Sequence, residues 1–521
     1  MNKKKRQEKQ DAMAIKQTYQ ILNGEVTVGF YEEPKKKQAQ PNRKGGATPT
    51  NEDSEIMLAR FSRVLLFILP GILAELKQID DPRDQSKIKY SLPMLMLFGI
   101  LMFISHCPSR RGANREIAKD SLLNMVAEFV PSVTEMPHAD TLCRLLQVIN
   151  VEDIDRYYEE ILVEFVRSKQ FRELNPGQLQ VAIDGTQKFS RRYQWDYRAL
   201  SRNAGDEEKQ QYYVKVLESV LILENGMVLP LLTEIMENKQ SSAETSDNSD
   251  RKIGKVSENA MKQDCETKAF HRLSGRLAKL LGNGGVNVTL DGLYATGPIV
   301  SRCEQLGWDF MIVLKKDSLK TVWEDFKGLQ MIETENSLQG QWGNRHQIYN
   351  WSNDIEYTYG NNHKRLNLNV VTCTETWTEH HPRSGKKPEQ KKTNYAWLSS
   401  KRLTAENVFY LCTKVARSRW RIENNFLVEK HHGYNYSHVY SYNWNAMKGY
   451  HYLMKFGVFI NVIIMHSITV IEYVVKEGFR GFVKKIWKMV GQGEWPNSNV
   501  ANKETKIKNH KIKFPKLRKA A

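Results

Sequence analysis

Cysteine is scarce in this sequence and widely spread. The 521 residues include six cysteines, and no two of them form a Cys-x-x-Cys pair. Disulfide frameworks and zinc knuckles need closely spaced cysteines, so the sequence argues against both and favours a reducing cytoplasm. His431 and His432 are adjacent, but no other histidine or cysteine stands at zinc-ligand spacing, so we expect no zinc site.

Clear membrane-spanning runs are also missing. The first ten residues, MNKKKRQEKQ, have no apolar run behind them, which is not typical of a signal peptide. The apolar stretches 64–74 and 92–107 are shorter than the ~20 residues that span a bilayer, and the longer stretch 456–475 carries polar residues. We therefore expect three buried core helices and no membrane partner, with membrane association as the weakest alternative.

Acidic residues are outnumbered by basic ones. The chain has 59 Asp and Glu against 77 Lys and Arg, a net charge of +18, and such an excess attracts nucleic acid or an anionic membrane surface. With 31 Gly and 16 Pro the chain cannot be collagen-like or of low complexity, and 40% hydrophobic residues allow a large core. The length predicts two to four domains.

The ends of the chain differ from its middle. Residues 1–50 are polar and basic and predict a flexible tail, with a non-specific DNA-binding arm as the sharper alternative. Residues 51–177 show apolar residues at helical spacing and predict a helical N-terminal region. A basic cluster within 110–115 suggests that this region binds DNA, although no clean helix-turn-helix signature is present. Residues 476–521 form a basic C-terminal segment.

The pattern changes to alternating strands and helices after residue 178. Buried strands are predicted within 179–189, 212–223 and 227–238, then a helix within 261–282, a strand within 286–295, a short helix within 298–307 and a strand within 308–316. A β-rich insertion is expected over 318–393, followed by a strand at 394–400 and one long helix from about 405 to beyond 430. This is the order of a ribonuclease H-like mixed sheet flanked by helices, with a catalytic core in two parts, 178–317 and 394–475.

Three acidic residues lie at informative places in this order. Asp184 is predicted to end the first strand, Asp291 ends the strand after the helix, and Glu423 lies on the later helix. Ligand sites in α/β sheets gather beyond the carboxyl ends of strands. Carboxylates from separate elements can share two Mg²⁺ ions that stabilise the attacking and leaving oxygens of phosphodiester cleavage. These residues are therefore our candidate catalytic metal ligands.

Each acid also has a simpler structural explanation. Asp184 could cap a strand-to-turn junction, Asp291 could belong to a plain turn, and Glu423 could pair with an arginine one helical turn earlier. Asp264 and Glu266 precede the second strand group on a helix, where a charged helix surface is favoured over a role as a supporting ligand.

The helix around Glu423 carries a further pattern. At ~100° per residue, Arg419, Glu423 and Lys430 fall within roughly 40° of one another and form one stripe. A metal-binding glutamate between two cations suits a site that a DNA phosphate approaches. For the neighbouring Trp420 and Phe426, core packing is favoured over base stacking.

Other basic residues are candidates for DNA contact. Arg191 and Arg192 follow Asp184 among aromatic residues, a mixture that suits a DNA backbone groove and a solvated loop equally well. Lys315 and Lys316 end a predicted strand near the carboxylates and could face a phosphate.

Several strings now point to a known group. The chain resembles bacterial insertion-sequence transposases of the DDE type over residues 55–470, members of which carry a Tyr-x2-Arg-x3-Glu-x6-Lys motif. Arg419, Glu423 and Lys430 match this motif, and Ala416 stands at the tyrosine position. The other matching strings are IDGT at 183–186, KQDCETKAFHRL at 262–273, LDGLYA at 290–295, RWRIENNF at 419–426 and GYNYSH at 433–438.

The resemblance implies Mg²⁺-dependent cleavage at transposon ends and strand transfer into target DNA, with Mn²⁺ as a substitute metal. It implies that Asp184, Asp291 and Glu423 bind the metal and that Arg419 and Lys430 contact phosphates of the transposon end. The implied partners are double-stranded DNA and a second copy in a synaptic homodimer, in the bacterial cytoplasm at the nucleoid. Ala416 weakens the case for a hairpin intermediate.

Two alternatives stay open beside this hypothesis. A ribonuclease H-like nuclease would cleave nucleic acid without strand transfer. A non-catalytic DNA-binding protein descended from a transposase would do neither, although the intact acids Asp184, Asp291 and Glu423 argue against it.

Overall fold

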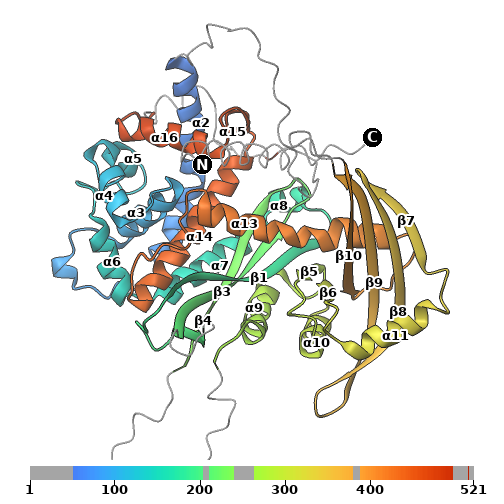
Figure 1. Cartoon of the computed structure of the whole chain (residues 1–521). Coiled ribbons are helices and arrows are strands. Elements are labelled where there is room, and N and C mark those ends of the chain that lie inside the picture. The colour runs from blue at the N-terminus through green and yellow to red at the C-terminus, as the bar shows by residue number, and fades with distance from the viewer. Residues whose placement is uncertain (1–50, 204–209, 240–262, 380–387, 497–513, 515–521) are drawn as a thin grey trace, which may run out of the picture. The chain divides into compact units, whose positions relative to one another are not determined.

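The computed structural model describes residues 51–203, 210–239, 263–379, 388–496 and residue 514 (Figure 1). The predicted N-terminal tail, the polar loop after 239 and the end of the C-terminal segment lie outside these residues. The chain divides into two compact units. The described part of the first unit comprises residues 51–174, 224–230, 426–496 and 514, and that of the second comprises 175–203, 210–223, 231–239, 263–379 and 388–425.

The first unit is helical, as the apolar spacing predicts. Its centre is α14 (Trp444–His466), which packs against α3 (Leu92–Ile104). The two backbones approach closely, because a Cβ added at Gly457 would lie 2.5 Å from Phe103 Cβ. The other helices are α2 (Asn51–Leu76), α4 (Arg110–Glu116), α5 (Leu123–Ala127), α6 (Ala139–Val148), α7 (Val151–Arg167), α8 (Lys169–Leu174), α15 (Ile471–Glu477) and α16 (Phe479–Gly491).

The apolar helices of this unit were also compared with the requirements of a membrane span. Among the described residues, Asp53–Leu76 is long and apolar enough to cross a bilayer, and half of its most apolar window is buried in protein. α14 and α15 meet the same requirement only as a pair, and they are bent by 97°. All but the first few side chains of α3 are fully enclosed in the core.

The second unit is built on a mixed ten-stranded sheet in the order β2-β3-β1-β5-β6-β10-β9-β8-β7, with β4 paired to β3. β1, β5 and β6 are parallel neighbours, and the remaining pairs with a recorded direction are antiparallel. The strands are β1 (Leu179–Arg191), β2 (Leu200–Asn203), β3 (Gln210–Ile222), β4 (Val228–Met236), β5 (Val286–Leu290), β6 (Asp309–Val313), β7 (Ser337–Trp342), β8 (Arg345–Tyr359), β9 (Lys364–Glu379) and β10 (Glu389–Ser399).

The predicted fold class is confirmed: a mixed sheet is flanked by helices, consistent with a ribonuclease H-like fold, and a helical region precedes it. The pattern of apolar residues explains the central elements. Every residue of β5 is buried, including the polar Asn287 and Thr289 that alternate with its apolar residues, as expected for a central parallel strand covered on both faces. α9 (Glu266–Leu281) buries an apolar stripe and ends at Gly282, whose φ of 90° favours glycine. α10 (Gly297–Gln305) connects β5 to β6.

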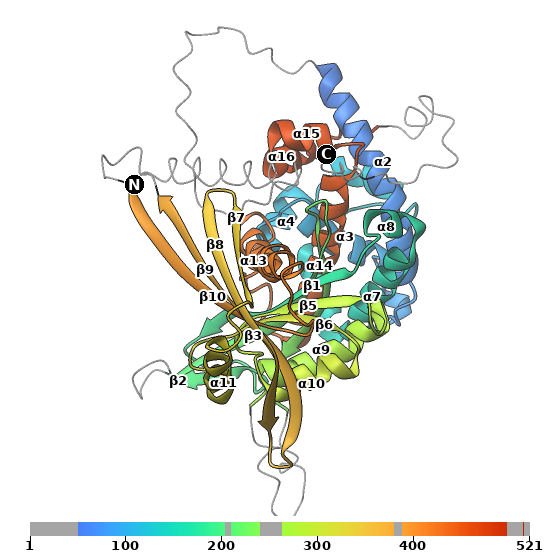
Figure 2. The ribbon, with the colours of Figure 1, turned by 90° about the vertical axis from the view of Figure 1, so that its right-hand side faces the viewer.

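The strands within 318–393 extend the central sheet instead of forming a sheet of their own. β10 pairs with β6 through Leu398 and with β9 over its whole length, so β9, β8 and β7 continue from it (Figure 2). This segment also contains α11 (Lys320–Gln330), which the sequence pattern did not reveal.

The prediction of one regular helix from about 405 to beyond 430 is wrong, because the segment is divided into helical pieces of different types. The segment comprises α12 (Val408–Tyr410), a π-helical turn (Leu411–Val415), a 3₁₀ turn (Ala416–Arg419) and α13 (Trp420–His431). We call residues 411–419 the π/3₁₀ segment. Its apolar side chains join a buried cluster with Tyr349, Trp351 and Trp397 of the sheet, and this packing overrides a uniform 3.6-residue period.

Candidate active site

Asp184 lies where two neighbouring strands stop pairing. β1 runs on to Arg191, so Asp184 does not end the strand as predicted. However, the last β1 residue that pairs with β5 is Ala182, and beyond it β1 pairs only with β3. The Asp184 carboxylate therefore lies just past the parallel ladder. Its Oδ1 accepts a 2.9 Å hydrogen bond from the Gly185 amide.

Asp291 directly follows the last residue of β5. Its Oδ1 accepts a 2.7 Å hydrogen bond from the backbone amide of Leu293, which fixes the side chain in a tight turn. Its Oδ2 lies 3.7 Å from Lys315 Nζ, and the Lys315 side chain is largely exposed. The turn alternative thus describes the local geometry correctly and leaves one carboxylate oxygen directed at a cation.

A single guanidinium group connects Asp184 with Glu423. Arg419 Nη2 donates to Glu423 Oε1 at 2.6 Å, and Nη1 lies 3.4 Å from Asp184 Oδ2. Arg419 closes the 3₁₀ turn, and this turn contacts β1, β5 and β6. The ion-pair alternative for Glu423 is therefore real, but the same arginine also brings Glu423 to the strand ends.

The electrostatics of Asp184 show crowding of negative charge. The pKa of Asp184 is raised to about 6: burial is the main cause, the charges of Asp291 and Glu266 add to it, and Arg419 and the Gly185 amide oppose it. The side chain is 18% exposed, so water stabilises its ionised form only weakly. Asp291 is thus one of the negative charges that act on Asp184.

Glu266 lies beneath Gly185 and its charge acts on Asp184, although the sequence favoured a charged helix surface for it. The expectation of a charged helix surface is wrong for this residue, because its side chain is 10% exposed and forms an ion pair with Lys215. Its Oε2 also accepts a 2.7 Å hydrogen bond from the hydroxyl of Tyr294. The Asp264 side chain is equally enclosed, at 9% exposed, and it pairs with Arg272 at 2.7 Å.

Of the other residues predicted to contact DNA, Lys315 lies beside Asp291 and Arg191 lies far from Asp184. Arg191 lies seven residues along β1 from Asp184, which corresponds to about 23 Å of extended strand, and Arg192 follows it. Lys316 is exposed beside Lys315. Lys430 belongs to the part of α13 that groups with the first unit, and its Nζ lies 5.8 Å from the ring of Phe426.

Trp420, Phe426 and Ala416, which stands at the tyrosine position of the motif, differ in burial. Phe426 is buried, as predicted, but Trp420 is 47% exposed, so core packing is wrong for Trp420. Ala416 belongs to the buried apolar cluster beneath the π/3₁₀ segment. This position faces the sheet, which explains why a small residue is accommodated there.

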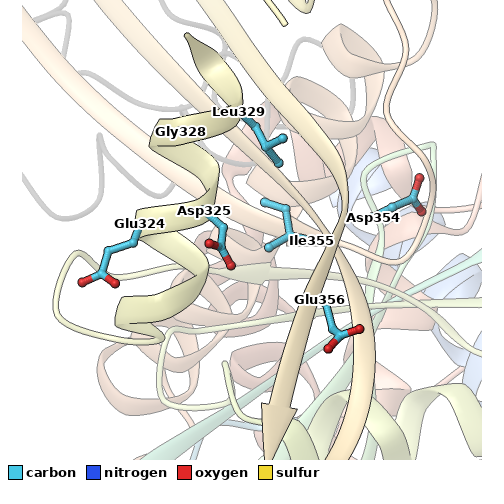
Figure 3. A pocket seen from close by; sticks show the side chains of 7 residues that line it. All are labelled: Glu324, Asp325, Gly328, Leu329, Asp354, Ile355 and Glu356. Atoms are coloured by element: carbon cyan, nitrogen blue, oxygen red, sulfur yellow. The ribbon is translucent and has the colours of Figure 1, made fainter. Parts of the chain in front are cut away.

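An open, acidic pocket in the described part of the second unit has none of the candidate metal-binding carboxylates in its lining. It is formed between α11 and β8 and is lined by Glu324, Asp325, Asp354 and Glu356 together with Gly328, Leu329 and Ile355 (Figure 3). An acidic lining repels a polyanion, so this pocket is not the place where DNA would bind.

The chemistry of the carboxylates fits a hard divalent cation. Asp184, Asp291 and Glu423 offer only oxygen ligands, which Mg²⁺ and Mn²⁺ prefer, and their crowded negative charge favours a cation. In the structure the positive charge comes from Arg419 and Lys315. Within the described residues, no three His, Cys, Asp or Glu side chains already stand at metal-ligand geometry.

The raised pKa of Asp184 predicts a pH-dependent stability effect. The pKa is 3.8 in the unfolded chain and about 6 in the folded chain, so the ionised group opposes folding. This cost is complete above pH 6, shrinks as the pH falls toward 3.8 and vanishes below it. In metal-free buffer, Asp184→Asn should therefore stabilise the protein on the order of 2 kcal/mol at pH 8. Urea unfolding at pH 8 and pH 4 measures this, and an equal difference at both pH values would contradict it.

Comparisons with known proteins bear on the identity of the chain. Residues 263–456 match the family described as the transposase DDE domain, and residues 73–160 match a family described as associated with that domain. Together the two matches cover just over half of the chain. Asp291 and Glu423 fall inside the first match, whereas Asp184 falls between the two. No curated protein matches the chain. The two family matches, on a fold consistent with ribonuclease H, show that the chain belongs to the DDE-type transposases of the insertion-sequence kind.

Proposed function

We propose that this transposase cleaves DNA at transposon ends and joins the freed 3′ ends to target DNA, with Asp184, Asp291 and Glu423 as ligands of Mg²⁺, or of Mn²⁺ in its place. The observation that carries the proposal is the bridging position of Arg419. The Arg419 guanidinium binds Asp184 on β1 and Glu423 on α13, which are more than two hundred residues apart in sequence. The charge of Asp291 also acts on Asp184.

Each residue of the site has a separate role in the proposed reaction. When bound, the divalent ion stabilises negative charge on the attacking and leaving oxygens of an in-line displacement. Asp184 lies on β1 just past its pairing with β5, Asp291 directly follows β5, and the amides of Gly185 and Leu293 orient the two carboxylates. Arg419 presents a planar pair of N–H donors that suits a phosphate as well as a carboxylate. Lys315 supplies a second, exposed cation beside Asp291.

We further propose how DNA is held. Arg419 and Lys430 bind phosphates of the transposon end, Lys315 and Lys316 bind phosphate near the carboxylates, and Arg191 and Arg192 bind the duplex farther along β1. The helical region 51–177 adds sequence-independent contacts, and the paired ends are held by a homodimer. The net charge of +18 supports this assignment, because counterion release would drive the binding.

The test is a joining assay with the inverted repeats that flank the coding region. The full chain is incubated with labelled end DNA, a supercoiled target and Mg²⁺ or EDTA. The proposal predicts a nick at the repeat end and a joined product, both lost in EDTA. Cleavage without joining would favour a ribonuclease H-like nuclease, and metal-independent binding without cleavage would favour a non-catalytic DNA-binding protein.

A further inference from the structure

A buried group of charges lies beside the π/3₁₀ segment and is not explained by the chemistry above. Glu375 on β9 is 0% exposed and accepts hydrogen bonds on both carboxylate oxygens. Its Oε2 accepts from Arg345 Nη1 at 2.7 Å, and its Oε1 accepts from Gln347 Nε2 at 2.5 Å and from Arg417 Nη2. Two arginines thus share one carboxylate in the core, an arrangement that burial makes costly unless the geometry is well satisfied.

Arg417 is held on its faces as well as at its end. Its guanidinium lies 4.8 Å from the ring centre of Trp342 on β7 and 4.5 Å from that of Tyr395 on β10. Arginine stacks in this way on aromatic rings, and the side chain has almost no exposed surface. The stacking and the bond to Glu375 hold the Arg417 guanidinium, although its buried Nε has no hydrogen-bond partner among the described residues. Arg417 is therefore fixed by strands on both sides.

A second connection ties the same segment to the sheet. The hydroxyl of Tyr349 on β8 lies 2.8 Å from Thr413 Oγ1 in the π-helical turn and donates to Gln347 Oε1 at 2.7 Å. Gln347 in turn binds Glu375. The π-helical turn and the 3₁₀ turn are thus joined to one polar network whose members lie on the strands β8 and β9.

The position of Arg417 in the 3₁₀ turn connects this network to the carboxylates. Arg417 and Arg419 are two residues apart in a turn of three residues per revolution, so their side chains leave the backbone about 120° apart. Arg417 is bound by Glu375, and Arg419 is bound by Asp184 and Glu423. A rotation of the turn that released Arg417 would also move Arg419.

We propose that Glu375 is a positioning residue for DNA cleavage: through Arg417, the strands β7 to β10 set the rotation of the 3₁₀ turn and thereby the placement of Arg419 and Glu423. This inference rests on the proposed function of Glu423. It gives the β-rich segment a role in building the site from within the same chain.

The test compares four variants of the full chain, one of which, Glu423→Gln, reports on the proposed function itself. Glu375→Gln removes the shared charge, and Arg417→Lys keeps the charge but loses the fork and the stacking. Glu379→Gln is the matched control, because it changes the same residue type on the same strand in an exposed pair with Lys391. Steady-state end cleavage gives kcat and KM, and hydrogen exchange reports on residues 411–423.

Glu375→Gln should lower kcat about a hundredfold, the cost of a displacement near 1 Å, and leave KM for end DNA within about twofold. Arg417→Lys should change kcat in the same direction, and both should speed exchange in 411–423 alone. Glu379→Gln should match the wild type. If Glu375→Gln does not fold, Arg417→Lys decides the question.

If Glu423→Gln is inactive, the proposed function stands. A wild-type kcat in folded Glu375→Gln or in Arg417→Lys would then overturn the inference alone. Faster exchange throughout the sheet, with kcat and KM both altered, would also overturn it in favour of general stability. Full activity of Glu423→Gln would overturn the proposed function and this inference together.

Discussion

Replacing Asp184, Asp291 or Glu423 by the corresponding amide will lower DNA-end cleavage by about 10³-fold or more and leave end binding within a few fold. Each amide keeps the shape of the side chain but removes the negative charge that would hold a divalent ion. Loss of the several kcal/mol that such an ion contributes to the transition state corresponds to this factor. Single-turnover nicking of labelled end DNA measures the rate, and a mobility-shift titration measures the binding.

Asp325→Asn is the matched control for this series. Asp325 is an exposed acid in the pocket between α11 and β8, so losing its charge should leave nicking unchanged (Figure 3). Mg²⁺-dependent nicking at the wild-type rate by Asp184→Asn would refute the assignment of the site. Loss of end binding in all three variants would instead show that the acids support the fold.

Gly185→Ala will disrupt the site without removing any of its functional groups. A Cβ at this position would lie 2.5 Å from Cδ of Glu266, whose carboxylate is held by Tyr294 and Lys215. Overpacking of this kind costs about 1–3 kcal/mol, and relief requires either that the Glu266 carboxylate leave Tyr294 and Lys215 or that β1 move where it carries Asp184. We expect cleavage to fall by about a hundredfold, because displacements near 1 Å are that costly to catalysis.

Gly328→Ala provides the comparison, because a Cβ there meets nothing within 4 Å and the residue lies in α11. It should leave cleavage unchanged and raise stability by up to about 1 kcal/mol, since alanine is the better helix former. Denaturant unfolding and single-turnover nicking separate the two effects. Normal cleavage by Gly185→Ala would show that Glu266 and β1 adjust freely, and the close packing would then have no role in the site.

The elements that position the acids could be predicted because their sequences carry local signals. β5 is rich in the β-branched residues Val286, Val288 and Thr289, which predicts a strand with Asp291 directly after it. The apolar stripe of α9 and the glycine after it predict the helix and its last residue. The prediction that Asp184 ends the first strand is wrong, because β1 continues past it on its pairing with β3; only the pairing of β1 with β5 stops, two residues before Asp184.

The residues that sequence patterns missed depend on partners far away in the chain. Glu266 opens a helix, where an acid is ordinary, and its partners Lys215 and Tyr294 come from β3 and from the turn after β5. A signal was present in Gly185, because a glycine inside a strand often marks a close approach. Glu375 is 42 residues from Arg417 in sequence, and no local pattern announces that pair.

The irregular π/3₁₀ segment illustrates a different limit. Its sequence is compatible with a regular helix, and the Arg-x3-Glu spacing of Arg419 and Glu423 is what an α-helix would need. The departure arises from packing against the sheet, where Leu411, Val415 and Ala416 fill the apolar cluster. Tertiary contacts therefore decide the turn geometry that local propensity leaves open.

The most direct measurement is the anomalous scattering of Mn²⁺ in crystals of the chain bound to transposon-end DNA. The account predicts an anomalous peak within ligand distance of carboxylate oxygens of Asp184, Asp291 and Glu423, with Arg419 moved to a phosphate and the peak lost in Asp184→Asn. A complex at saturating Mn²⁺ that shows no peak there, with Arg419 still bound to Asp184 and Glu423, would contradict the account.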